Sequence, residues 1–151
     1  MKWVLLIMCA GVLMAPALAG CATTDGNEQA EQGNTEAEVQ LSCEQLSEHE
    51  DVSKEVELQV GGTLTVTLCS NPSTGFGWGE PEIGDPGVVQ QSDHEFIPAQ
   101  GEKPPPGAPG RETWVFEAVG QGQTTMSLAY SQAWEGGEKD RWTLTVDVTV
   151  T

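Results

Sequence analysis

The segment "EVELQVGGTLTVTLC", residues 55–69, alternates apolar and polar side chains on either side of a glycine pair. Its large aliphatic residues fall on one face of each half: Val56, Leu58, Val60, Leu64, Val66 and Leu68. Alternation with a period of two is typical of a strand that buries one face. The glycine pair predicts a turn between two such strands.

The same alternation continues to the C-terminus. Five more short strands are predicted, in the segments 76–82, 88–97, 112–119, 124–131 and 141–150. β-branched and aromatic residues dominate these segments, Gly and Pro separate them, and no segment has the periodicity of a helix. Seven short strands within about 100 residues predict an all-β fold, an Ig-like antiparallel β-sandwich.

Three unusual connections are expected at one end of this sandwich. If successive strands run in opposite directions, the second, fourth and sixth connections share an end. These connections are SNPSTG (70–75), PAQGEKPPPGAPG (98–110) and SQAWEGGEKD (131–140). The connections at the other end are short glycine turns. Loops on a rigid scaffold commonly carry binding sites, so the end with the long loops is the candidate site.

The first twenty residues have the layout of a signal peptide: Lys2, an apolar run over 3–14, then small residues. Leu18-Ala19-Gly20-Cys21 resembles the lipobox of prokaryotic lipoproteins. That resemblance implies cleavage before Cys21, a lipid on its sulfur, and an exported protein held on the cell membrane, facing the periplasm or the cell exterior. A plain secretory signal with a chance cysteine, or an uncleaved anchor, is the alternative.

Residues 22–42 contain five acidic residues, no basic residue and no aromatic residue. Such a segment buries too little apolar surface to offset its chain entropy. We therefore expect a lipidated cysteine and a flexible acidic tether over 21–42, and one folded domain over 43–151. The formal net charge of −17 argues against nucleic acid as a partner, since binding phosphates requires clustered Lys and Arg. It also argues against docking flat on anionic lipid.

The chain has four cysteines. Cys9 lies in the signal peptide and Cys21 in the lipobox, which leaves Cys43 and Cys69. An even pair of cysteines in an exported domain favours a disulfide over a metal site. Two free buried thiols are the alternative.

The three loops, taken in order, resemble the chagasin-type inhibitors of papain-like cysteine proteases, over residues 55–150. The family's first loop, Asn-Pro-Thr-Thr-Gly-Phe/Tyr, matches Asn71, Pro72, Ser73, Thr74, Gly75 and Phe76, with Trp78 following. Its Gly-x-x-Gly loop matches Gly107, Ala108, Pro109 and Gly110. Its Arg-Pro-Trp loop matches Gln132, Ala133 and Trp134. The loss of Arg-Pro puts the stiffness of the third loop in question.

The resemblance implies an Ig-like fold and a reversible, competitive, tight-binding inhibitor. The residues matched above would block the cleft of a papain-like protease. Pro72 fixes a backbone angle and Gly75 permits a close approach of the main chain. The hydroxyls of Ser73 and Thr74 suit a Cys-His pair, because a hydroxyl both donates and accepts hydrogen bonds. Trp134 is an anchor of the hot-spot kind. A monomer without cofactor is expected.

The residues themselves argue against an enzyme. His49 and His94 are the only histidines, and no spacing resembles a zinc site. No Gly-x-Ser-x-Gly motif is present, and Asp93-His94-Glu95 is expected on a solvated strand face. The remaining alternative is a non-inhibitory cell-surface binding or scaffold module on the same fold. An inhibitor depends on Trp134, whereas a scaffold tolerates its loss.

Overall fold

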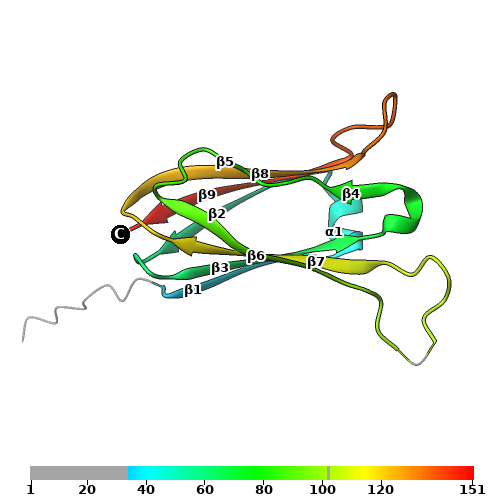
Figure 1. Cartoon of the computed structure of the whole chain (residues 1–151), viewed down its shortest axis with the longest axis horizontal. Coiled ribbons are helices and arrows are strands. Elements are labelled where there is room, and N and C mark those ends of the chain that lie inside the picture. Colours follow the sequence, from blue (N-terminus) through cyan, green and yellow to red (C-terminus); the bar gives the residue numbers. More distant parts are fainter. Residues whose placement is uncertain (1–33, 102) are drawn as a thin grey trace, which may run out of the picture. The chain divides into compact units, whose positions relative to one another are not determined.

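A computed structural model describes residues 34–101 and 103–151. The signal peptide, Cys21 and the first part of the expected tether lie outside the described residues. Two β-sheets face each other, as Figure 1 shows, and their inner faces form one hydrophobic core. The predicted all-β sandwich is confirmed.

The first sheet has the strand order β1-β3-β7-β6. Its strands are β1 (Glu36–Leu41), β3 (Thr63–Ser70), β7 (Gly110–Ala118) and β6 (Val89–Ile97). The second sheet has the order β2-β9-β8-β4, and β5 also pairs with β8. Its strands are β2 (Asp51–Leu58), β9 (Trp142–Val150), β8 (Gly122–Gln132), β4 (Phe76–Trp78) and β5 (Glu82–Ile83).

The glycine turn between β2 and β3 joins the two sheets, so these two strands do not pair with each other. β2 instead pairs with β9, and β1 pairs with β3, both in parallel. The remaining pairs are antiparallel, as expected. These directions place the connections before β4, β7 and β9 at one end of the sandwich.

Part of the expected tether is folded, and that prediction was wrong for residues 36–41. β1 alternates like the other strands, because Glu36, Glu38 and Gln40 are exposed while Val39 and Leu41 are buried in the core. Pairing with β3 satisfies its backbone groups. The two large aliphatic residues of the segment are therefore enough, because the rest of the domain supplies the surface against which they pack.

A short helix, α1 (Cys43–Glu48), follows β1, although the sequence indicated no helix. Ser42 and Gln45 form a capping box at its start: the Ser42 hydroxyl accepts from the Gln45 amide at 3.3 Å, and the Gln45 side chain accepts from the Ser42 amide at 2.9 Å. Leu46 is fully buried and fixes the helix against the core. The helix carries the chain from the first sheet to the second.

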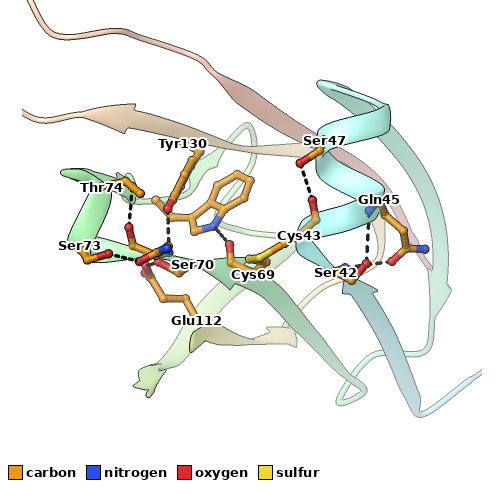
Figure 2. The surroundings of a disulfide bond; sticks show 12 residues. Ser42, Cys43, Gln45, Ser47, Cys69, Ser70, Ser73, Thr74, Glu112 and Tyr130 are labelled. Carbon is orange, nitrogen blue, oxygen red and sulfur yellow. Dashed lines mark hydrogen bonds between the residues drawn. A yellow bond between two sulfur atoms is a disulfide. The ribbon is translucent and has the colours of Figure 1, made fainter. Parts of the chain in front are cut away.

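The predicted disulfide is present between Cys43 and Cys69, with the α-carbons 5.1 Å apart (Figure 2). It joins the first residue of α1 to the penultimate residue of β3. The Trp78 indole donates a hydrogen bond of 2.9 Å to the carbonyl oxygen of Cys69. The disulfide thus lies directly beside the point where β3 leads into the NPSTG loop.

Within the described part of the chain, no helix is long and apolar enough to cross a membrane.

Candidate functional site

The three long connections meet at one end of the sandwich, at the right of Figure 1. We call them the first loop (71–75), the second loop (98–109) and the third loop (133–141). The first loop touches both others. Asn71 Nδ2 donates 3.0 Å to the carbonyl oxygen of Gly107 in the second loop, and a Cβ added to Gly75 would lie 2.4 Å from the Trp134 ring of the third. The sequence argument from strand direction therefore placed these loops correctly.

The first loop is a single turn of 3₁₀ helix, Pro72–Thr74, that ends at Gly75. The Thr74 amide donates to the Asn71 carbonyl at 3.1 Å, and the Gly75 amide donates to that of Pro72 at 3.0 Å. Pro72 suits the first position of the turn because the amide it lacks has no partner there. Gly75 has φ 81° and ψ 0°, a left-handed conformation that favours glycine.

Besides the backbone bond from the Thr74 amide, Asn71 holds the first loop in place through four hydrogen bonds that involve side chains. Its amide donates 2.8 Å to the Tyr130 hydroxyl on β8, and its Nδ2 donates to Gly107. Its Oδ1 accepts from the Ser73 hydroxyl at 2.6 Å, and its carbonyl oxygen accepts from the Thr74 hydroxyl at 2.7 Å (Figure 2). Each hydroxyl has one hydrogen, and both hydrogens are directed at Asn71. Ser73 and Thr74 therefore offer lone pairs, and not O–H donors, to a partner.

Tyr130 supports this arrangement from inside the sandwich. It is almost fully buried, and its ring stacks on Trp142 at 4.7 Å and on Phe76 at 5.5 Å between ring centroids. Trp78 packs against the same ring at 5.1 Å. The Tyr130 hydroxyl, which accepts the hydrogen bond from the Asn71 amide, is thus held in place by an aromatic cluster beneath the first loop. Phe76, one of the predicted site residues, belongs to this support and is only half-buried.

The second loop turns at its tip, where the Ala108 amide donates 3.0 Å to the Pro105 carbonyl and Gly107 has φ 79°. Gly107 lies against the first loop, because an added Cβ would be 3.5 Å from the Ser73 hydroxyl. Pro109 is exposed, whereas Gly110 is buried at the start of β7. An added Cβ on Gly110 would lie 2.5 Å from the Ile97 carbonyl, so its role is close packing of the strands that carry the loop.

The third loop is a hairpin that carries Trp134, whose side chain is half exposed. The Gln132 amide donates to the Glu138 carbonyl at 2.8 Å, and the Glu138 amide donates to the Gln132 side chain at 2.9 Å. The Gly137 amide donates 3.2 Å to the Trp134 carbonyl, closing a turn with Gly136 at φ 78°. Ala133 is exposed. Gln132, which stands where the family has Arg, therefore closes the hairpin.

A buried carboxylate that sequence reasoning missed joins the strands beneath the first two loops. Glu112 on β7 is 7% exposed and accepts from the Ser70 hydroxyl at 2.6 Å (Figure 2). Its second oxygen lies 3.1 Å from His94 Nε2 on β6, and the His94 ring stacks on Trp114 at 4.7 Å. The carboxylate stands between the hydroxyl and the imidazole, which is not the order of a nucleophile activated by a base. Ser70 is also fully buried.

In the ranges that the structure describes, no group of three or more His, Cys, Asp or Glu side chains is arranged to hold a metal ion.

At one end of the sandwich, the first loop is thus in contact with both the second and the third. Residues 57–148 match the chagasin family peptidase inhibitor I42, and the chain belongs to this family. It is thus a member of a protease inhibitor family and not an enzyme, as the sequence indicated. No curated protein sequence matches the chain at a significant level.

Two solved structures with the same fold support the architecture. The cysteine protease inhibitor EhICP2 from Entamoeba histolytica is similar with a TM-score of 0.60 and 23% identity, over 77% of this chain and 97% of that chain. PbICP-C, solved in complex with falcipain-2, is similar with a TM-score of 0.55 and 16% identity, over 75% of this chain and 99% of that chain.

Proposed function

We propose that this chain is a reversible, competitive inhibitor of papain-like cysteine proteases, and that the three-loop end occupies the protease cleft. Family membership supports the inhibitory role. The observation that carries the binding mode is the assembly of the loops into one edge: the first loop is tied to the second by Asn71 and Gly107 and is covered by Trp134 of the third.

The edge is ordered before any partner arrives. Internal hydrogen bonds fix the first loop, so that docking loses little conformational entropy, which favours tight binding. Trp134 keeps 50% of its surface exposed while its ring packs against the backbone of Gly75. A large aromatic side chain that is exposed yet fixed in place is the kind of group that dominates interface energies.

The hydrogen-bond directions refine the mechanism expected from sequence. Because Ser73 and Thr74 already donate to Asn71, the tip of the first loop presents acceptors. It is therefore suited to the N–H of a catalytic imidazolium, rather than to donating to a thiolate. The helical turn at Pro72–Thr74 also does not present an extended peptide to the nucleophile. The inhibitor should accordingly remain uncleaved.

We also propose that the mature chain is lipid-anchored through Cys21 and faces the periplasm or the cell exterior. The support is the Leu18-Ala19-Gly20-Cys21 pattern after an apolar run. Intact mass of the mature protein tests it directly. A mature chain without lipid on Cys21 would contradict the anchor, as would a Cys21→Ala variant whose signal peptide is removed and that still fractionates with membranes as the parent does.

The inhibitor proposal is tested with the chain from Ala22 onward, which keeps β1 in the folded domain. The expected result is competitive inhibition of papain, weakened at least thirtyfold (about 2 kcal/mol, typical of an aromatic hot spot) in Trp134→Ala. Thermal melting of both proteins controls for misfolding. If the folded parent inhibits no member of a panel of papain-like proteases, the non-inhibitory binding or scaffold module replaces the proposal.

A further inference from the structure

The third loop contains a lysine whose ammonium group is directed into its own hairpin. Lys139 Nζ donates a hydrogen bond to the carbonyl oxygen of Gln132 and a second, at 3.3 Å, to that of Trp134. In the part of the chain that the structure describes, no carboxylate pairs with Lys139, although Glu138 and Asp140 flank it. The ammonium thus binds main-chain oxygens in preference to the adjacent acidic side chains.

The backbone after Lys139 favours this inward direction. Asp140 has φ 52°, the only left-handed conformation of a non-glycine residue in the described ranges. The Asp140 amide donates 2.9 Å to the Ser131 hydroxyl, and the Arg141 amide donates 2.9 Å to the Tyr130 carbonyl. The chain therefore bends sharply back onto β8 directly after Lys139. This bend holds Lys139 beside the start of the hairpin.

The two carbonyl oxygens to which Lys139 donates, those of Gln132 and Trp134, lie on either side of Ala133. Gln132 is the last residue of β8, and Trp134 is the exposed ring that covers Gly75. Gly137 also packs close to the ring, since an added Cβ would lie 3.0 Å from Trp134 Nε1. A charged donor that bridges these oxygens restricts the backbone of the residue that carries the ring.

We propose that Lys139 is the positioning residue of Trp134. It holds the third-loop backbone in the conformation in which the indole covers Gly75, and it acts on protease binding through Trp134 rather than by touching the protease. The proposal rests on the proposed inhibitory function for its binding readout. It has an independent readout in the free protein.

The free protein is examined first, by ¹⁵N relaxation of the backbone amides of 134–137. In Lys139→Met the order parameters of these amides should fall from about 0.85, typical of rigid backbone, to below about 0.6. Lys139→Arg, which keeps a charged donor, should retain most of the rigidity. Lys54→Met is the matched control, because it removes the same charge from an exposed site on β2. Unchanged order parameters in Lys139→Met would overturn the proposal, whether or not the chain inhibits a protease.

The second measurement is a double-mutant cycle on the inhibition constant for papain. Lys139→Met should raise this constant about tenfold. A third loop that is mobile in the free protein must be ordered when it docks, and the conformational entropy lost weakens binding. Lys54→Met and Lys139→Arg should stay within about twofold of the parent. In the Trp134→Ala background, Lys139→Met should add no further loss, since two residues that act together are not additive. If the tenfold loss persists without Trp134, Lys139 contacts the protease itself and the positioning role is wrong.

Discussion

The indole ring of Trp134 lies directly on the α-carbon of Gly75: a Cβ built at Gly75 would be 2.4 Å from Trp134 Cη2 and 2.7 Å from Cζ3. A real Cβ does not tolerate such distances, so the ring can lie this close to residue 75 only because that residue has no side chain. The glycine thus serves two purposes at once. Its left-handed backbone ends the 3₁₀ turn, and its missing side chain leaves room for the tryptophan.

Gly75→Val should therefore displace Trp134 and also strain the backbone. The left-handed conformation alone costs about 1–3 kcal/mol for a side chain that disfavours it. We expect a lower melting temperature and an inhibition constant raised at least as much as in Trp134→Ala. Gly77→Ala is the control, because an added Cβ there meets nothing within 4 Å. Equal affinity of folded Gly75→Val and the parent would show that this edge is not the site.

Tyr130→Phe removes only the hydroxyl that accepts from the Asn71 amide. The ring stacking is retained, while a part-buried donor loses its partner, at a cost of about 1–3 kcal/mol. We expect a loss of this size in the free energy of unfolding, measured by urea titration, together with weaker inhibition. A loss of stability with an unchanged inhibition constant would mean that the first loop keeps its shape without this bond.

Replacing the hydroxyls separates their internal role from contact with a partner. Thr74→Ala removes a bond to the Asn71 carbonyl, and Ser73→Ala removes a bond to its side chain. Each should weaken inhibition by less than Trp134→Ala, by about 1 kcal/mol, because water partly replaces a lost hydroxyl. Inhibition constants for the two variants against papain check this. A loss larger than that of Trp134→Ala would place the main binding energy in the first loop.

Glu112→Leu should destabilise the sandwich by about 1–3 kcal/mol, because the fully buried Ser70 hydroxyl would lose its acceptor. Glu112→Gln retains an acceptor and should cost less. Urea unfolding of both variants measures the difference. If Leu and Gln are equally stable at this position, the hydrogen bond to Ser70 contributes nothing.

The Cys43–Cys69 disulfide closes a separation of 26 residues. In the chain-entropy model such a link contributes about 3.5 kcal/mol. The double variant Cys43→Ala/Cys69→Ala should lose a stability of this order in urea unfolding at neutral pH. The same midpoint for the oxidised parent and the variant would contradict a stabilising role.

Sequence alternation predicted seven strands from residue 55 onward, whereas this part of the chain forms the eight strands β2–β9, because the segment predicted as one strand over 76–82 is divided into β4 and β5. The same signal was present at Ala37, Val39 and Leu41 of β1 but was outweighed by the acidic composition of the segment. Composition measures the apolar surface that a segment can bury by itself. β1 is ordered because it pairs with β3, a strand distant from it in sequence. The Ser42 and Gln45 capping box was the available signal for α1, a helix too short to show periodicity.

The grouping of the three loops at one end followed from strand direction alone, but their contacts did not. Whether Trp134 reaches Gly75 depends on how the hairpin at 132–138 closes and on where Lys139 directs its ammonium group. These details arise from backbone conformations at Gly136 and Asp140 that no residue pattern specified. The bond between Asn71 and Tyr130 joins residues 59 positions apart and was equally hidden.

The parallel pairing of β1 with β3 has a consequence for how the inhibitor is presented. β3 ends at the first loop, so β1 begins at the opposite pole, where the Asn34 carbonyl accepts from the Gln59 amide at 3.0 Å. Any chain leading from the proposed lipid at Cys21 must therefore enter the domain at the pole farthest from the loops. From Cys21 to Glu36 the chain advances by fifteen positions, which span at most about 54 Å. The attached end of the domain and its three loops therefore lie at opposite poles of the sandwich.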